Sequence, residues 1–252
     1  MRILLIRHAE PDYGGDRLTE KGKREAALLA ERICRYDIRD FYVSPLGRAV
    51  ETAGHTLKRM GREAETLPWL QEFRGRMPDE KTGKLRVAWD LPPRVWTAEP
   101  GFMDPDAWAQ ARVYEGTNVR EIWEETKAGV DQLMGRYGFR KDGPVWLGDT
   151  NNTDTIALFC HFVISMMIAG YLMDLSPIMM THRFLCLPSS VTELVTEERI
   201  PGEVAFRMTK LGDMTHLEAG GEPRSVAGQY PECYTGVDST DQRINGNHVP
   251  LP

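Results

Sequence analysis

Cysteine is scarce in this chain of 252 residues, and its four copies are scattered at Cys34, Cys160, Cys186 and Cys233. No two of them form a C-x-x-C pair, which argues against a structural zinc site and gives no sign of a disulfide framework. A reducing compartment, the cytoplasm, is therefore the expected location. Runs of lysine and arginine are also lacking and the formal net charge is −6, so a nucleic-acid partner is not expected. An anionic substrate would have to be held by a local cluster of cationic side chains.

Long apolar runs are nearly absent as well. The run Ile3 to Ile6 at the N-terminus is too short for a signal peptide. The stretch from Ile156 to Leu175 is apolar enough to suggest a membrane span. It carries His161 and follows the turn-rich residues 149–152, so we interpret it as a buried strand that leads directly into a core helix. A membrane span is the less favoured alternative, and no membrane partner is expected.

The rest of the pattern alternates strands with helices. Short apolar runs predict strands at residues 3–6, 41–43, 65–67, 144–147, 155–159, 191–195 and 204–208. Helical spacing predicts a helix capped by Thr19, a second helix that starts at Ser44-Pro45, and a third from about 118 to 137 with a capping box of Asn118 and Glu121. This order favours an α/β fold, a three-layer α/β/α sandwich around a mixed, mainly parallel sheet with an inserted cap segment.

Two segments break the alternation. Residues 74–116 contain five prolines and the tryptophans Trp89, Trp96 and Trp108, which indicates an ordered insertion rather than a flexible linker. Beyond Leu217 the chain is rich in glycine and proline and lacks periodicity. We therefore expect one domain over residues 1–217, with the insertion at 74–116, and a C-terminal arm over residues 218–252. The arm is long enough to wrap a neighbouring subunit, which leaves a homo-oligomer open.

Arg7 and His8 directly follow the first predicted strand. Ligand sites in open α/β sheets gather at the carboxyl ends of the strands, so this is where a reactive histidine is expected. A neutral imidazole has a lone pair that can accept a phosphoryl group, and the guanidinium of Arg7 offers a forked donor for phosphoryl oxygens. Taken alone, the pair is a weak signal, and a polar strand end at which Arg7 pairs with a nearby acid is the alternative.

Arg48 lies one turn into the helix predicted after Ser44-Pro45, which again follows a strand. Free backbone amides, the helix dipole and a guanidinium would converge there on one anion. The alternative is a surface ion pair with Glu51 or Glu65.

Glu72 and His161 complete the set of candidates. Glu72 follows a short strand at the edge of the insertion, and a partly buried glutamate can protonate a leaving oxygen; a solvated loop acid is the alternative. His161 sits at a predicted strand-to-helix junction, which makes it a ligand candidate, although a lone histidine in an apolar stretch is usually a satisfied core residue.

Together these segments resemble the histidine phosphatase superfamily, also called phosphoglycerate-mutase-like proteins. The resemblance begins with Leu4-Leu5-Ile6-Arg7-His8-Ala9-Glu10 and continues through Leu18-Thr19-Glu20-Lys21-Gly22. Its most specific block is Ser44-Pro45-Leu46-x-Arg48-Ala49-x-Glu51-Thr52-Ala53. Phe159-Cys160-His161 takes the place of the second histidine motif, and Ser190-Val191-Thr192-Glu193-Leu194 and Leu211-Gly212-Asp213-x-x-His216-Leu217 are similar to the closing segments. The blocks follow the family's order over most of residues 1–217.

The resemblance implies a role for each candidate. His8 is the nucleophile that becomes phosphorylated, and Arg7, Arg48 and His161 hold the phosphoryl oxygens. Glu72 gives a proton to the leaving group and then takes one from the attacking water. No metal and no other cofactor is implied, because the cationic side chains neutralise the phosphoryl charge.

Three departures from the family pattern bear on the activity. Ala9 and Phe162 stand where a glycine usually follows each histidine, and the loop of residues 11–17 lacks the asparagine of true mutases. The missing asparagine disfavours a mutase, which must grip a second anionic group, and favours a phosphatase that acts on a small-molecule phosphate ester. A phosphoglycerate-type mutase and a catalytically silent phosphate-binding protein of the same fold are the alternatives.

Two further hypotheses concern residues near these segments. The insertion starts immediately after Glu72, so we hypothesise that it forms a cap that selects the leaving group. His182 and Arg183 flank an apolar run and could reach the site, whereas His216 is expected to be structural.

Overall fold

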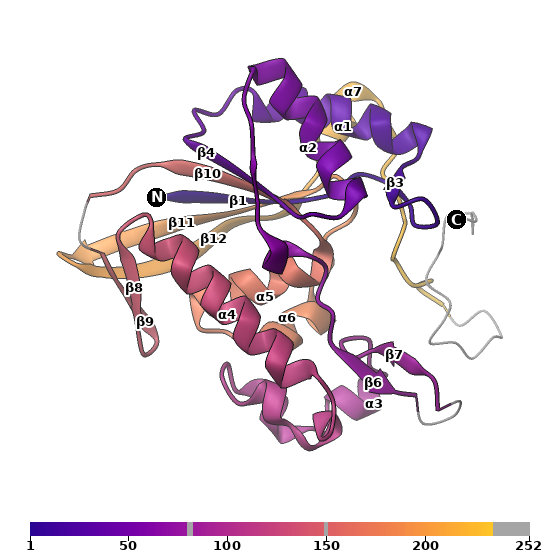
Figure 1. Ribbon diagram of the computed structural model, residues 1–252, viewed down its shortest axis with the longest axis vertical. Helices are drawn as coiled ribbons and strands as arrows, with labels where there is room; N and C mark the ends of the chain where they lie inside the picture. Colours follow the sequence, from indigo (N-terminus) through magenta and orange to yellow (C-terminus); the bar gives the residue numbers. More distant parts are fainter. Residues whose placement is uncertain (80–82, 149–150, 234–252) are drawn as a thin grey trace.

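The computed structural model of the chain describes residues 1–79, 83–148 and 151–233 (Figure 1). Its central feature is an eight-stranded sheet with the strand order β5-β4-β10-β1-β11-β12-β9-β8. These strands are β1 (Arg2–Arg7), β4 (Asp40–Val43), β5 (Glu65–Thr66), β8 (Phe139–Asp142), β9 (Val145–Gly148), β10 (Thr155–Cys160), β11 (Val191–Ile200) and β12 (Glu203–Asp213). A two-stranded hairpin of β2 (Pro11–Asp12) and β3 (Arg17–Leu18) follows β1.

The α/β fold expected from the sequence is confirmed, but the sheet is not mainly parallel. The pairs from β5 to β1 are parallel, whereas those from β1 to β8 are antiparallel. The prediction assumed a helix between successive strands, and β8-β9 and β11-β12 are instead joined by tight turns. Gly143 and Gly202 form these turns with φ of 58° and 82°, which glycine adopts at no steric cost.

Helices cover both faces of the sheet and produce three layers (Figure 1). One face carries α1 (Glu20–Ile33), α2 (Gly47–Met60) and α7 (Thr215–Gly220), and the other carries α4 (Val119–Gly135), α5 (Phe162–Met173) and α6 (Pro177–Arg183). Successive side chains of a strand point to opposite faces of the sheet, so the side chains of β1 are divided between two apolar cores. Ile3 and Leu5 join the larger apolar core with α4, α5 and α6, and Leu4 and Ile6 join the smaller core with α1 and α2. The continuous apolar run in β1 is therefore buried on both sides.

Two of the three predicted helix starts are confirmed, at α1 and α4, and one is wrong, at α2. Thr19 caps α1 as predicted, since its side chain accepts a hydrogen bond from the N–H of Gly22. The second helix begins at Gly47 rather than at Ser44-Pro45, and the Ser44 hydroxyl instead accepts from the N–H of Leu46. The predicted capping box at α4 is absent, because the side chain of Asn118 accepts from the N–H of Arg76 in the insertion.

The apolar stretch from Ile156 to Leu175 is a strand followed by a helix, as predicted. Residues 155–160 form β10 and residues 162–173 form α5, and nearly all of both elements is buried. Within residues 1–79, 83–148 and 151–233, no helix is long and apolar enough to cross a membrane.

The insertion forms an ordered layer on the face that carries α4 to α6 (Figure 1). It contains the hairpin β6 (Arg76–Pro78) and β7 (Leu85–Val87), the short helix α3 (Pro93–Trp96), and 3₁₀ turns at Pro100–Met103, Trp108–Gln110 and Arg112–Tyr114, after an earlier turn at Pro68–Leu70. Trp96 and Trp108 are buried in the larger core. These aromatic side chains extend the core beyond the sheet and fix the insertion against it.

The C-terminal segment packs against its own chain as far as the structure describes it. The expected boundary at Leu217 falls inside α7, and Glu222 pairs with Lys21 and Arg24 of α1. Ser225 and Ala227 are buried. The last part of the expected arm, residues 234–252, lies outside the described residues.

Candidate active site

The site forms where two neighbouring parallel strands end. β1 and β10 pair in register, with Arg7 opposite Cys160, so the next residue of each strand is a histidine. The ring centroids of His8 and His161 are 5.1 Å apart. The structure thus brings together two candidates that are separated by more than half of the chain.

His8 is held in one orientation and is shielded from water. Its side chain is buried, and Nδ1 lies 2.8 Å from the backbone oxygen of Ala9. Its backbone N–H donates to the oxygen of Cys160, and its backbone oxygen accepts from the N–H of Ser189. Burial, followed by the nearby guanidinium groups of Arg7 and Arg48, holds the pKa of His8 well below its usual value.

His161 has a different partner. Its Nε2 lies 2.8 Å from the hydroxyl oxygen of Ser44 at the end of β4, and its Nδ1 is buried with no hydrogen-bond partner in the part of the chain that the structure describes. Burial is the largest cause that lowers the pKa of His161 well below its usual value, and His8, Arg48 and Arg7 add to it. Both imidazoles are therefore uncharged near neutral pH.

The two candidate arginines lie beside this pair of rings but already contact protein oxygens. Arg7 donates through Nη1 to the backbone oxygen of Cys186 at 2.5 Å and through Nη2 to that of Ala227 at 3.3 Å. Arg48 donates through Nη1 to Oδ1 of Asp16 at 2.5 Å. The Nε atoms of both arginines are buried and have no partner among the described residues. The alternative of a surface ion pair between Arg48 and Glu51 or Glu65 is wrong, because Arg48 is largely buried and pairs with Asp16.

Glu72 lies at the first turn of α5, which begins immediately after His161. Its carboxylate accepts hydrogen bonds from the N–H groups of Ile164 at 3.1 Å and Val163 at 3.4 Å. It also accepts from the N–H of Phe73. Glu72 is half-buried and anchored rather than a freely solvated loop acid, because helix N-terminal amides orient its carboxylate.

Several residues at the site were missed by sequence reasoning. The ring of Tyr13 contacts His8 edge-on, with centroids 6.5 Å apart, and the guanidinium of Arg48 lies 5.5 Å from the Tyr13 ring centroid. Asp16 contacts Arg48, and Ser44 contacts His161. Ala227, in the C-terminal segment, contacts Arg7. Ser44 stood within the motif that contains Arg48, and Tyr13 and Asp16 stood within the loop of residues 11–17, but no role was assigned to any of them.

The remaining histidines have contacts of their own. His182 stacks on Trp96 of the insertion, with centroids 5.2 Å apart, and burial lowers its pKa to about 4. His216 bonds through Nε2 to the hydroxyl of Ser189 at 3.0 Å. Since the N–H of Ser189 donates to the backbone oxygen of His8, His216 is linked to His8 through Ser189. The expected structural role of His216 agrees with this placement.

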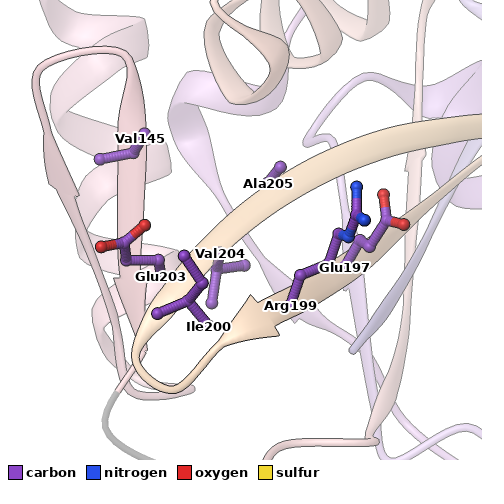
Figure 2. Close-up of a pocket in the computed structure, with 7 residues that line it drawn as sticks. All are labelled: Val145, Glu197, Arg199, Ile200, Glu203, Val204 and Ala205. Atoms are coloured by element: carbon purple, nitrogen blue, oxygen red, sulfur yellow. The ribbon is translucent and has the colours of Figure 1, made fainter.

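The pocket in Figure 2 lies elsewhere. Residues of β9 and the β11-β12 hairpin line it, namely Val145, Glu197, Arg199, Ile200, Glu203, Val204 and Ala205. β11 runs antiparallel to β1, with Val191 opposite Ile6 and Val195 opposite Arg2. The hairpin tip is therefore beyond the N-terminal end of β1, whereas His8 follows its carboxyl end.

Comparison with known proteins adds a family and a set of similar folds. A model of the histidine phosphatase superfamily (branch 1) matches residues 3–207. A 2,3-bisphosphoglycerate-dependent phosphoglycerate mutase of Thermoplasma acidophilum is 34% identical over 97 residues, which are 32% of this chain and 48% of that protein. The chain therefore spans about half the length of this relative.

Two solved structures illustrate the similarity in fold. A mutant of phosphoserine phosphatase from Entamoeba histolytica in complex with phosphoserine has a TM-score of 0.57 at 18% identity. The superposition covers 86% of this chain and 98% of the phosphatase chain. A mycobacterial glucosyl-3-phosphoglycerate phosphatase has a TM-score of 0.57 at 19% identity and covers 84% of this chain and 98% of its own. At these identities the likeness concerns the fold alone.

Proposed function

This chain belongs to the histidine phosphatase superfamily (branch 1), and on that basis we propose that it is a phosphatase that hydrolyses a small-molecule phosphate monoester through a phosphohistidine at His8. The proposal needs no metal or organic cofactor and no nucleic-acid or membrane partner, and it places the enzyme in the cytoplasm. The roles of Arg7, Arg48, Glu72 and His161 are part of the same proposal.

One observation carries the proposal: three buried nitrogen atoms around His8 lack an acceptor in the described part of the chain. They are Nε of Arg7, Nε of Arg48 and Nδ1 of His161. Buried donors without a partner are rare and costly. A phosphoryl group has three acceptor oxygens, which suit donors of this kind.

Ser44 supports the donor role of His161. Its hydroxyl oxygen accepts from the N–H of Leu46, so its own hydrogen is available for Nε2 of His161. A neutral imidazole that accepts at Nε2 carries its proton at Nδ1. His161 then offers this N–H to a phosphoryl oxygen.

His8 is suited to be the nucleophile. With its pKa held well below the usual value, the ring is neutral near pH 7, and the Nδ1–H donates to the oxygen of Ala9. The lone pair is therefore on Nε2. In the first step the bond from Nε2 to phosphorus forms, the bond from phosphorus to the ester oxygen breaks, and Glu72 donates a proton to that oxygen.

The second step reverses these roles. Glu72, now a carboxylate, takes a proton from a water molecule, whose oxygen attacks phosphorus while the bond to His8 breaks. The products are inorganic phosphate and the neutral imidazole. Arg7 and Arg48 neutralise the phosphoryl charge in both steps, and this electrostatic stabilisation with positioning supplies most of the rate in phosphoryl transfer.

Substrate reaches His8 only after a covering segment moves, because the side chain is 2% exposed. The β2-β3 hairpin is the segment that we propose to move. Its Tyr13 is half-exposed and lies against His8. Polar contacts to α2 hold the hairpin, and Leu18 is the residue of the hairpin that joins a small buried cluster, with Ala9 and Ala26.

The test is phosphate release from a panel of phosphate monoesters by wild type and by His8→Ala. We expect wild type to release phosphate, and the variant to lose at least about a thousandfold in kcat/KM, the order seen when a nucleophile is removed. His55→Ala replaces a half-buried histidine in the middle of α2; it is the matched control and should keep its activity. Acid-quenched reactions with radiolabelled ester should leave label on wild type and none on His8→Ala.

Two outcomes would contradict the proposal. If 3-phosphoglycerate is converted to its isomer without release of phosphate, the enzyme is a mutase. If wild type releases no phosphate from any ester but still binds inorganic phosphate, the chain is a silent phosphate-binding protein of this fold.

A further inference from the structure

The carboxylate of Asp16 lies on groups that would otherwise receive an anionic ligand. Its Oδ2 accepts from the backbone N–H of Gly47, the first residue of α2, at 2.7 Å. Its Oδ1 accepts from Nη1 of Arg48 at 2.5 Å. A helix N-terminus together with a guanidinium is a common binding arrangement for phosphates and carboxylates. The carboxylate of Asp16 thus occupies the donor groups of Gly47 and Arg48 in place of an anionic ligand.

The backbone around Asp16 is fitted to this contact. Asp16 has φ of 46°, a left-handed conformation that few residues other than glycine adopt and that aspartate tolerates better than most. A Cβ at Gly47 would lie 2.2 Å from the backbone oxygen of Asp16. The hairpin therefore approaches α2 as closely as it does only because residue 47 is glycine, and this approach seats the carboxylate on Arg48.

The positive charge near His8 is limited and does not balance a second anion on the substrate. Arg7 and Arg48 are the two guanidinium groups that act on the pKa of His8, and Asp16 neutralises one of them. Arg17, in the same hairpin, pairs with Asp12 and is largely exposed. A phosphoryl dianion by itself matches the charge of Arg7 and Arg48. A substrate with an additional carboxylate or phosphate on its leaving group would place that second negative charge near the carboxylate of Asp16.

We propose that Asp16 is a specificity-determining residue that restricts this site to phosphate monoesters whose leaving group carries no negative charge. This inference rests on the proposed function and refines it by naming the substrate class. One phosphoryl group competes with Asp16 for Arg48 and displaces it. A second anion, as in a phosphoglycerate, is repelled by the displaced carboxylate, which stays tethered to the hairpin beside the site.

The experiment compares wild type, Asp16→Asn and Asp12→Asn with two esters. p-Nitrophenyl phosphate has an uncharged leaving group, and 3-phosphoglycerate carries a carboxylate. We expect wild type to prefer the aryl ester, and Asp16→Asn to raise the ratio of kcat/KM for 3-phosphoglycerate to that for the aryl ester by about tenfold, the order of one partly screened like-charge contact. Asp12→Asn removes an acid of the same hairpin that pairs with Arg17 and should leave the ratio within about twofold.

Binding of inorganic phosphate, measured by calorimetry, separates this inference from the proposed function. Removal of the competing carboxylate should tighten phosphate binding by about tenfold in Asp16→Asn, whether or not the protein turns over any ester. If tighter binding occurs without hydrolysis by any of the three proteins, the proposed function fails and the competition at Arg48 stands. If hydrolysis occurs but Asp16→Asn changes neither the ratio nor the affinity for phosphate, the specificity role is overturned. A wild type that prefers 3-phosphoglycerate overturns it as well.

Discussion

Each imidazole of the site is kept neutral by burial, yet each is oriented by a different kind of partner. His8 uses a backbone oxygen of its own neighbour, Ala9, whereas His161 uses the side chain of Ser44 from another strand. With Nδ1 as the donor, the first contact leaves the lone pair of His8 on Nε2, where the proposed mechanism requires it. The second leaves Nδ1 of His161 as a donor. The two rings thus take complementary roles although their pKa values are shifted in the same direction.

Buried neutral histidines should make the folding stability depend on pH. The pKa values of His8 and His161 are held well below the usual 6.5 by burial, and that of His216 is lowered to about 4 for the same reason. Below pH 6.5 the unfolded chain binds protons at these positions and the folded chain does not. Stability is therefore complete above this pH and is lost as the pH falls toward the lowered pKa values.

We accordingly expect the free energy of unfolding in urea to be lower at pH 5 than at pH 7. His216 alone would contribute about 2 kcal/mol to this difference, because over about 1.5 pH units, from 6.5 down to 5, the unfolded chain binds a proton at this position that the folded chain does not bind. His216→Gln should show a smaller difference between the two pH values than wild type. An equal or higher stability of wild type at pH 5 would show that these rings are not neutral in the folded state.

The residues of this site differ in how far the sequence could reveal them. Arg7, His8, Arg48 and His161 could be placed together because each follows a predicted strand or opens a predicted helix, and such ends meet at one edge of a sheet. Asp16 could not be placed in this way. Its contact depends on a left-handed backbone and on the missing side chain of Gly47, and no periodicity in the sequence encodes either feature.

At the scale of elements, the start of α5 links the second histidine to the proposed acid. α5 begins at Phe162, directly after His161, and its first free amides bind Glu72 from the chain segment that precedes the insertion. The same helix start therefore fixes the orientation of the carboxylate relative to both rings. The bulky Phe162 at this point is accommodated, since its ring lies 5.7 Å from the guanidinium carbon of Arg7 as a cation–π contact.

Glu72→Gln should separate the acid role from this structural one. Glutamine keeps an oxygen that can accept from the amides of α5 but has no proton to give to a leaving alkoxide. We expect kcat for an alkyl phosphate such as glycerol 2-phosphate to fall by about a hundredfold or more, the usual contribution of general acid catalysis. The loss for p-nitrophenyl phosphate should be much smaller, because nitrophenolate leaves without protonation.

Glu125→Gln is the matched control for this comparison. Glu125 is exposed on α4 and pairs with Arg74, so its replacement should affect neither ester. Equal losses for both esters in Glu72→Gln, with an unchanged melting temperature, would mean that Glu72 orients α5 and does not supply the proton.

The elements themselves were largely foreseeable from the sequence, and the errors have local causes. β1, β10 and α5 followed from apolar runs that are buried on all sides. The start of α2 and the capping box of α4 were mispredicted because Ser44 and Asn118 are engaged by His161 and by Arg76. Side chains that favour helix caps were used there for tertiary contacts, which short-range sequence rules do not describe.

At the scale of the whole molecule, three segments that are distant in sequence converge on the carboxyl ends of β1 and β10. The β2-β3 hairpin contacts His8 and Arg48, and the C-terminal segment contacts Arg7 through Ala227. The insertion reaches the site through Trp89, whose ring packs edge-on against Phe162 with centroids 6.5 Å apart. The C-terminal segment and the insertion are also joined to each other, since the hydroxyl of Tyr230 donates to Asp90.

The hypothesis that the insertion forms a cap over the site can be tested at one residue. If the insertion selects the leaving group, Trp89 is the residue to test, because its ring packs against Phe162, which in turn contacts Arg7. Trp89→Ala should change the ratio of kcat/KM for 1-naphthyl phosphate to that for methyl phosphate by about tenfold, the scale of one aromatic contact. Methyl phosphate should still be hydrolysed, since its leaving group is too small to reach the insertion. Val95→Ala, on an exposed position of α3 in the same insertion, should leave the ratio unchanged. An unchanged ratio in a folded Trp89→Ala protein would show that the insertion supports the core without choosing the substrate, and selectivity would then rest with the β2-β3 hairpin and Asp16.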